Sequence, residues 1–262
     1  MRAEFIGAPT RRLFVLLRTP AEGSGECTLV VPPFAEEMNK SRRLVTDFAN
    51  RERCLGRGVL SVDLSGTGDS DGEFAAARIE GWIEDLAIAA AWSRAAGWPI
   101  TRLLGIRLGA ILAAKLVRMR AMEVSSVVYW QPVMNGARFM DQFLRLRAMA
   151  SRMTPGPAES VSDLRNKLLA GGTVEIAGYC LSRALCADID ALDLAGETGT
   201  PFPQTRWVDV VVDASAPVPS GTQRVVDSLR LAGCEIEHVR VTGEPFWTAT
   251  EVVRNPALVA AS

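Results

Sequence analysis

Apolar runs and amphipathic stretches alternate along most of this chain. Thr28–Phe34 and Gly58–Leu64 are mostly apolar runs of strand length, and each is followed by a polar loop and a stretch with helical periodicity. Strands buried on both faces of a parallel sheet have such near-continuous apolar runs, because neither face meets water. The pattern therefore predicts an α/β fold, a doubly wound and mostly parallel sheet with helices on both faces.

The expected elements can be placed from this pattern. Two short strands open the chain, near Ala3–Ile6 and Arg12–Arg18. Later strands are expected at 100–106, 124–133, 207–214 and 235–241, and helices at 38–56, 79–96, 108–119 and 219–232, with a last helix after Phe246. Gly56, Gly97 and Gly233 mark three of the helix ends.

The alternation stops between Met134 and Gln204. That stretch is polar and helical in pattern, with helices expected at 135–153, 163–171 and 175–185 and a Pro/Gly break at Thr154–Ala158. A chain of 262 residues with 48% hydrophobic content can form one large core. We therefore predict a single domain, residues 1–262, with a helical cap inserted at 134–204.

Charge and composition exclude several classes of function. The net charge of −1 provides no field that would attract nucleic acid, and no apolar run reaches the roughly 20 residues of a membrane span. The five cysteines include no CxxC pair, and the single histidine, His238, forms no zinc-binding spacing pattern with any of them. We predict free thiols, no metal, no cofactor and a cytoplasmic location.

One sharp bend carries most of the chemical information. Gly105–Gly109 has the form G-x-x-x-G between an apolar strand and an apolar helix, and its central residue is Arg107. Ligands of parallel sheets bind beyond the carboxyl ends of the strands, where such a bend places its central side chain. Arg107 is therefore expected to point into the principal pocket.

Three further loops follow strands and should reach the same edge of the sheet. Asp63–Gly72 is rich in Gly and Asp, and Val31–Lys40 could supply backbone N–H groups to an oxyanion. Gly243–Trp247 follows the final strand. We interpret the Asp69-Ser70-Asp71 stretch as a hydrogen-bonded turn and Phe246-Trp247 as packing beneath the last helix.

These motifs, in this order, resemble the α/β-hydrolase superfamily over essentially the whole chain. More narrowly, the stretches PPFAEEMNKSRR, DLSGTGDSDGEF and GIRLGA resemble the second type of hydrolase associated with the exosortase A system. The resemblance implies an α/β-hydrolase fold and an association with bacterial exopolysaccharide and protein-sorting genes.

The superfamily's catalytic triad does not carry over onto this sequence. The nucleophile position holds Arg107, whose guanidinium stays protonated and has no lone pair for attack. The acid would fall near Ala216, about three residues beyond Asp213, and the base near Glu244. His238 lies inside the preceding strand, on the order of 20 Å from that position at about 3.3 Å per residue. Ser-His-Asp chemistry is therefore not expected.

Two interpretations of Arg107 stay open at this point. At a helix N-terminus its guanidinium could bind a carboxylate or phosphate, with Phe34, Ala35 and Leu108 as further ligand contacts. Alternatively, it forms an internal salt bridge with Glu36, Glu37, Asp63 or Glu244 that seals the pocket.

Three functions compete on this basis. The first is a non-catalytic protein that binds a small anionic or acyl ligand, or a partner protein of the exopolysaccharide or sorting machinery. The second is an atypical ester or thioester hydrolase or acyl transferase, in which Glu36, Asp63 or Glu244 activates water and Arg107 stabilises the oxyanion. The third is a scaffold whose cap docks a partner, and a homo-oligomer is compatible with all three.

Overall fold

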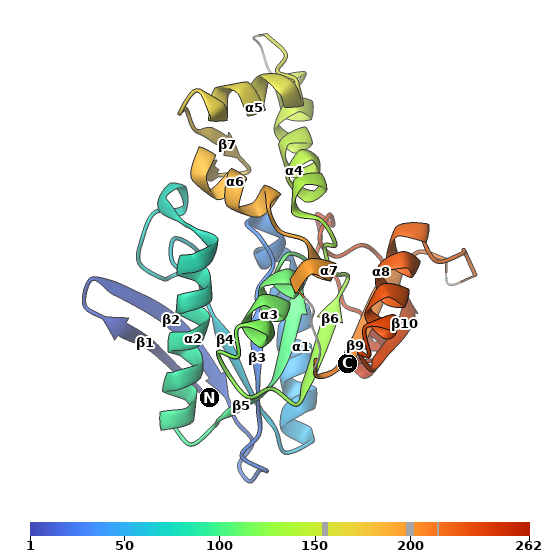
Figure 1. Cartoon of the computed structure of the whole chain (residues 1–262). Helices are drawn as coiled ribbons and strands as arrows, with labels where there is room; N and C mark the ends of the chain where they lie inside the picture. The colour runs from blue at the N-terminus through green and yellow to red at the C-terminus, as the bar shows by residue number, and fades with distance from the viewer. Residues whose placement is uncertain (154–156, 198–201, 214) are drawn as a thin grey trace.

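A twisted eight-stranded sheet forms the centre of the molecule (Figure 1). The computed structural model describes residues 1–153, 157–197, 202–213 and 215–262, and within these ranges the strand order is β1-β2-β4-β3-β5-β6-β9-β10. β2 pairs antiparallel with β1 and β4, and the other pairs are parallel. The strands are β1 (Arg2–Ala8), β2 (Arg11–Arg18), β3 (Cys27–Val31), β4 (Gly58–Val62), β5 (Ile100–Ile106), β6 (Ser126–Trp130), β9 (Gln204–Val211) and β10 (Ile236–Thr242).

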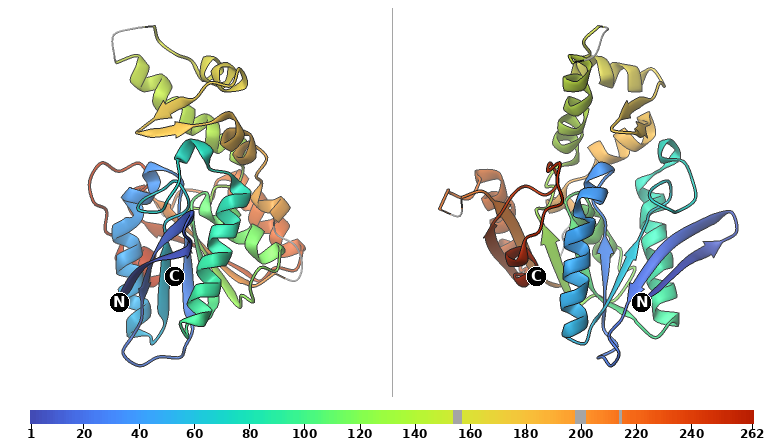
Figure 2. Two further views of the ribbon diagram at one scale, coloured as in Figure 1. Left: turned by 90° about the vertical axis from the view of Figure 1, so that its left-hand side faces the viewer. Right: turned by 180° about the vertical axis from the view of Figure 1, so that it is seen from behind.

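Helices cover both faces of this sheet. α1 (Glu36–Cys54) and α9 (Pro256–Ala260) lie on one face, and α2 (Ile79–Ala95), α3 (Gly109–Arg118) and α8 (Ser220–Leu231) on the other (Figure 2). Neighbouring residues of a strand therefore enter different cores: Leu103 packs with the α2 and α3 side, and Leu104 with α1. The predicted doubly wound, mostly parallel fold is confirmed.

The segment between β6 and β9 forms a separate layer beyond the carboxyl ends of the strands (Figure 1). We call this layer the cap. It contains α4 (Gly136–Ser151), α5 (Val161–Leu169), β7 (Val174–Ile176), β8 (Tyr179–Leu181) and α6 (Arg183–Asp190). The last helix of the segment, α7 (Leu194–Glu197), packs against α3 and α8 instead. A short 3₁₀ helix, Phe74–Ala76, rises from the core toward β8.

The helix expected over 175–185 is wrong in its first half, which forms an antiparallel hairpin of β7 and β8. Ala177 and Gly178 have φ values of 50° and 84°, the two positive values that a tight two-residue hairpin turn requires. Ile176 and Leu181 are buried on the hairpin's inner side. Turn geometry and burial thus override the helical pattern, and α6 begins only after Ser182, whose side chain accepts the Leu185 N–H.

The last helix begins later than the sequence pattern predicts, which places it after Phe246. α9 begins at Pro256, and the side chain of Asn255 accepts the N–H of Leu258. Proline at the first helical position and asparagine before it are both start signals, because neither leaves a backbone donor unsatisfied there.

A buried carboxylate joins the far end of α1 to the sheet. Glu52 is fully buried, and its carboxylate accepts hydrogen bonds from Arg57 Nε at 2.6 Å and Arg102 Nη1 at 2.6 Å. Arg57 begins the connection into β4, and Arg102 lies on β5. The pKa of Arg102 is lowered by burial, against the opposing effect of Glu52. Removal of the Glu52 charge would leave two nearby guanidinium groups without compensation.

We predict that Glu52→Gln lowers the free energy of unfolding by about 3 kcal/mol, because breaking a buried pair leaves uncompensated charge. Glu237→Gln is the matched control, since the Arg206–Glu237 pair is exposed and such pairs contribute about 0–1 kcal/mol. Urea denaturation of both variants measures the difference. Equal losses in the two variants would show that the Glu52 cluster is not a special constraint.

Candidate functional site

The bend between β5 and α3 places Arg107 at the carboxyl edge of the sheet. Arg107 has a φ of 56°, a left-handed conformation that is uncommon for a residue with a side chain. A Cβ added at Gly105 would lie 2.6 Å from the Ala110 Cα, and one at Gly109 would overlap the carbonyl oxygen of Val31. The two glycines therefore allow the bend to pack tightly between β3 and α3, as the G-x-x-x-G pattern predicts.

The Arg107 guanidinium is held by protein groups. Its Nε and Nη2 both donate to Glu37 Oε1 at 3.2 Å, and its Nη1 donates to the Gln131 carbonyl at 3.2 Å. Only 11% of the Arg107 side chain is exposed. Of the four carboxylates expected as salt-bridge partners, Glu37 at the start of α1 is the one that makes the contact.

The ring of Trp247 covers the same guanidinium. The Arg107 Cζ lies 4.6 Å from the Trp247 ring centroid, within the range of cation–π attraction. Trp247 follows β10, in the segment where the resemblance places the catalytic base. Phe246 packs in the core as expected, whereas the contact between Trp247 and Arg107 was not foreseen. No local pattern could reveal it, because the two residues meet only after the sheet has formed.

The ion pair with Arg107 only partly offsets the cost of burying the Glu37 charge. Burial raises the pKa of the Glu37 carboxyl, and the charges of Arg107 and Lys40 counteract only part of that effect. Glu37 Oε2 is buried and has no hydrogen-bond partner among the residues described. The neutral form of Glu37 is thus favoured more than it is in water.

Two backbone N–H groups lie beside the bend. Ala35 and Leu108 occupy the positions at which hydrolases of this fold present oxyanion donors, after the third strand and after the nucleophile. Ala35 has a φ of 50°. Neither N–H makes a hydrogen bond with any residue that the structure describes. Both N–H groups remain free to donate a hydrogen bond to a ligand oxygen.

Phe34, the third expected ligand contact, is committed to packing. Its ring lies 5.0 Å from Phe143 and 5.7 Å from Phe139, both on α4 of the cap. It also contacts Phe74 and Trp82, at 5.4 and 6.1 Å. Aromatic rings therefore fill the space between the post-β3 loop and the cap.

The other expected carboxylates do not reach Arg107. Glu36 accepts a hydrogen bond from Asn39 Nδ2 at 3.2 Å, and Asp63 Oδ2 accepts the Asp69 N–H at 3.0 Å. Burial raises the pKa of Asp63. Glu244 is exposed and forms no ion pair within the described part of the chain. No hydrogen bond or ion pair between described residues joins any of the three to Arg107.

The remaining triad candidates have structural contacts of their own. His238 Nε2 lies 2.9 Å from Asp209 Oδ2, and the other oxygen of Asp209 accepts the Trp207 indole N–H at 2.7 Å. This cluster is buried within β9 and β10. Asp213 is exposed, and hydrogen bonds from the Ser215 N–H and hydroxyl lower the pKa of its carboxyl.

The described residues supply few other sites for chemistry. All five cysteines are free thiols, and Cys27, Cys186 and Cys234 are buried. No group of three or more His, Cys, Asp or Glu side chains in the described ranges is arranged to hold a metal ion. Across those same ranges, no helix has both the length and the apolar character needed to cross a bilayer.

Comparison of sequences finds no related family or protein. No family model matches the chain, and a search of the curated proteins returns no match. The chain does resemble many solved structures. Est1E from Butyrivibrio proteoclasticus with ferulic acid bound has a TM-score of 0.70 and 13% identity, covering 99% of this chain and 96% of that one.

Two other structures share the fold at lower TM-scores. An α/β serine hydrolase homologue from Coxiella burnetii has a TM-score of 0.56 and 16% identity, covering 94% of this chain and 89% of that one. Mouse α/β hydrolase domain-containing protein 10 has a TM-score of 0.56 and 14% identity, with coverage of 93% and 90%. At such identities the likeness concerns the fold alone. The chain has the α/β-hydrolase fold.

Proposed function

We propose that this chain is a non-catalytic protein of the α/β-hydrolase fold that binds a small anionic or acyl ligand. We further propose that it acts in the cytoplasm, in association with exosortase and exopolysaccharide systems, as the resemblance of its sequence motifs implies. The ligand's oxygen atoms would be recognised by hydrogen-bond donors, and no covalent bond to the protein would form.

The observation that carries this proposal is the state of Arg107. A residue that attacks an ester must offer a lone pair to the substrate, and a guanidinium has none. Arg107 is moreover held by Glu37, by the Gln131 carbonyl and by the ring of Trp247. The side chains that surround the bend thus stabilise a cation at the position where acyl transfer would need a nucleophile.

The alternative of a carboxylate-based hydrolase has less support. A general base must come within hydrogen-bond reach of the water that it activates, and the oxyanion stabiliser must face the same reacting carbon. Glu36 and Asp63 have partners elsewhere, and Glu244 is exposed. Glu37, which does touch Arg107, neutralises the charge that would otherwise stabilise an oxyanion.

We predict that the purified chain does not accelerate hydrolysis of p-nitrophenyl acetate, p-nitrophenyl butyrate or a short acyl thioester above the background rate. The expected rates of wild type and Arg107→Ala are equal, because neither has a nucleophile at the bend. Spectrophotometric assays at several enzyme concentrations measure this. Turnover that scales with wild-type protein and disappears in Arg107→Ala would contradict the proposal.

A second prediction concerns the titration of Glu37. Its pKa in the folded chain is raised above the unfolded value of about 4.3. The associated stabilisation is fully present below the unfolded pKa and is lost as the pH rises through the folded pKa. Glu37→Gln cannot titrate, so the free energy of unfolding of wild type minus that of the variant should fall between pH 4 and pH 7. Urea denaturation across this range tests it; a constant difference would show that burial does not perturb Glu37.

A partner protein is the second candidate occupant, and one surface favours it. Leu146, Met149 and Met153 are exposed and recur at helical spacing along α4 and the turn after it. Arg145 directly precedes Leu146 and Arg152 directly precedes Met153, and neither arginine forms an ion pair within the described residues. An apolar strip flanked by arginines fits a partner surface that is apolar with acidic residues around it.

We predict that Leu146→Glu/Met149→Glu abolishes capture of a component of the sorting or polysaccharide machinery from an extract of the source organism. Mass spectrometry identifies the captured protein, and a control with Val252→Glu, which changes an exposed apolar residue outside the cap, should capture it as wild type does. Equal capture by wild type and the double variant would exclude the cap as the docking surface.

A further inference from the structure

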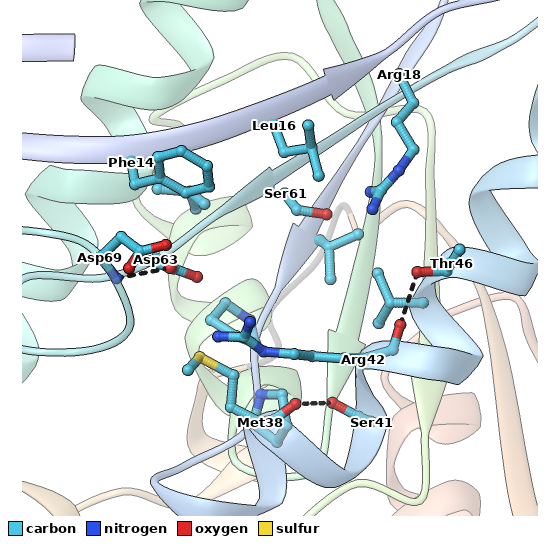
Figure 3. Close-up of a pocket in the computed structure, with 15 residues that line it drawn as sticks. Phe14, Leu16, Arg18, Met38, Ser41, Arg42, Thr46, Ser61, Asp63 and Asp69 are labelled. Atoms are coloured by element: carbon cyan, nitrogen blue, oxygen red, sulfur yellow. Dashed lines mark hydrogen bonds between the residues drawn. The ribbon is translucent and has the colours of Figure 1, made fainter. Parts of the chain in front are cut away.

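A cavity of about 190 Å³ lies on the α1 face of the sheet, between α1, β2 and β4 (Figure 3). Alternate residues of a strand face the same side, so Phe14, Leu16 and Arg18 of β2 line it together. Leu16 pairs with Ser61 of β4, which also faces the cavity. The space exists because α1 covers the middle of the sheet and leaves the β2 side of this face open.

Arg18 has no counter-ion in this cavity. Its Nη1 is buried without a hydrogen-bond partner among the described residues, and Arg18 forms no ion pair with any of them. Burial and the nearby charge of Arg53 both lower the pKa of Arg18, which means that its surroundings disfavour the cation. A partly buried guanidinium without an anion is unfavourable, and proteins ordinarily pair such groups.

A second unsatisfied donor faces the same space. Ser61 Oγ is buried without a partner among the described residues, and its side chain points toward the Arg18 guanidinium in Figure 3. A hydroxyl and a guanidinium that converge on one volume match the two oxygens of a carboxylate. This contrasts with Arg107, in which every guanidinium nitrogen donates to Glu37 or to the Gln131 carbonyl.

The far end of the cavity has the opposite charge. Asp63 and Asp69 line it there. Asp63 follows Val62, which pairs with Val15 of β2, and the Phe14 carbonyl accepts the Asp63 N–H. Phe14 and Arg18 are four residues apart, or about 13 Å along an extended strand. Between the two ends Leu16, Met38 and Val45 supply apolar wall, beside the polar residues Ser41, Arg42 and Thr46 of α1.

Arg42 of α1 extends across the cavity toward the acidic end in Figure 3. Its side chain is exposed, and its charge lowers the pKa of Asp63 against the effect of burial. Arg42 thus partly balances the acidic end, and Arg18 has no such balance. The cavity accordingly recognises one negative charge, at its Arg18 end.

We propose that this cavity binds a small monocarboxylate with an apolar body, whose carboxylate contacts Arg18 and Ser61 and whose body lies along Leu16 and Val45. The inference rests on the proposed binding function and adds to it a site and a class of ligand. A second negative charge at the other end of the ligand would approach Asp63 and Asp69. The cavity therefore discriminates against dicarboxylates of the same length.

A ligand-detected NMR titration of the full chain at pH 7 tests this, with hexanoate as the probe. Hexanoate should bind with a dissociation constant in the millimolar range, about what so small a ligand can reach, and adipate at least tenfold more weakly. Arg18→Met should weaken hexanoate binding by about tenfold or more, because a hydrogen-bonded charge is lost. Arg43→Met is the matched control, since Arg43 lies on α1 outside the cavity and pairs with Asp47; it should bind as wild type does.

The outcomes separate this site from the bend. If Arg18→Met proves poorly folded, Ser61→Ala provides the test and should weaken binding by about fivefold. Three results would overturn the proposed cavity site and leave the proposed function unaffected. They are no hexanoate binding by wild type, equal binding of adipate, and hexanoate binding that is lost in Arg107→Met and retained in Arg18→Met. The opposite result is hexanoate binding that depends on Arg18 together with ester turnover that depends on Arg107. It would overturn the proposed non-catalytic function and leave the proposed cavity site unaffected.

Discussion

The positive charge of Arg107 at the β5–α3 bend is the constraint on which the site depends. The left-handed backbone and the flanking glycines direct this side chain toward the carboxyl edge of the sheet, where little water reaches it. A charge so placed must be compensated locally. Glu37, the Gln131 carbonyl and the Trp247 ring supply that compensation from three other segments of the chain.

The loops around this bend are occupied by contacts within the protein. The post-β3 loop supplies an aromatic ring, Phe34, to the cap, and a carboxylate, Glu37, to the bend. The segment after β10 supplies Trp247 where a base would be needed for catalysis. Only the free N–H groups of Ala35 and Leu108 keep the arrangement of an oxyanion site. A fold can be retained while the chemistry of its site changes, because the fold is maintained by the sheet and its two cores.

Two arginines of this chain differ in whether the protein supplies hydrogen-bond partners and an opposite charge for the guanidinium. Each guanidinium nitrogen of Arg107 makes a hydrogen bond within the protein, so a ligand there would compete with Glu37. Arg18 has a buried donor that no described residue satisfies, and an apolar wall and a hydroxyl stand beside it. An unsatisfied charge favours a ligand that brings the opposite charge. The anion site that we propose thus lies away from the position that the fold would suggest.

The sequence by itself determined the class of fold, the bend and the residue at its centre, because apolar periodicity and glycine spacing are local properties. It left the partner of Arg107 open between a ligand anion and one of four carboxylates of the chain. The tertiary structure decided three further features: that Glu37 pairs with Arg107, that Trp247 covers it, and that Arg18 Nη1 has no partner among the described residues. Each of these depends on segments far apart in sequence. The sequence pattern of 175–185 predicts a helix where the β7–β8 hairpin forms, for a related reason. The turn geometry and the burial of one side of the hairpin determine the structure there, and the helical periodicity does not. Local patterns specify elements, and only their packing specifies which charges meet.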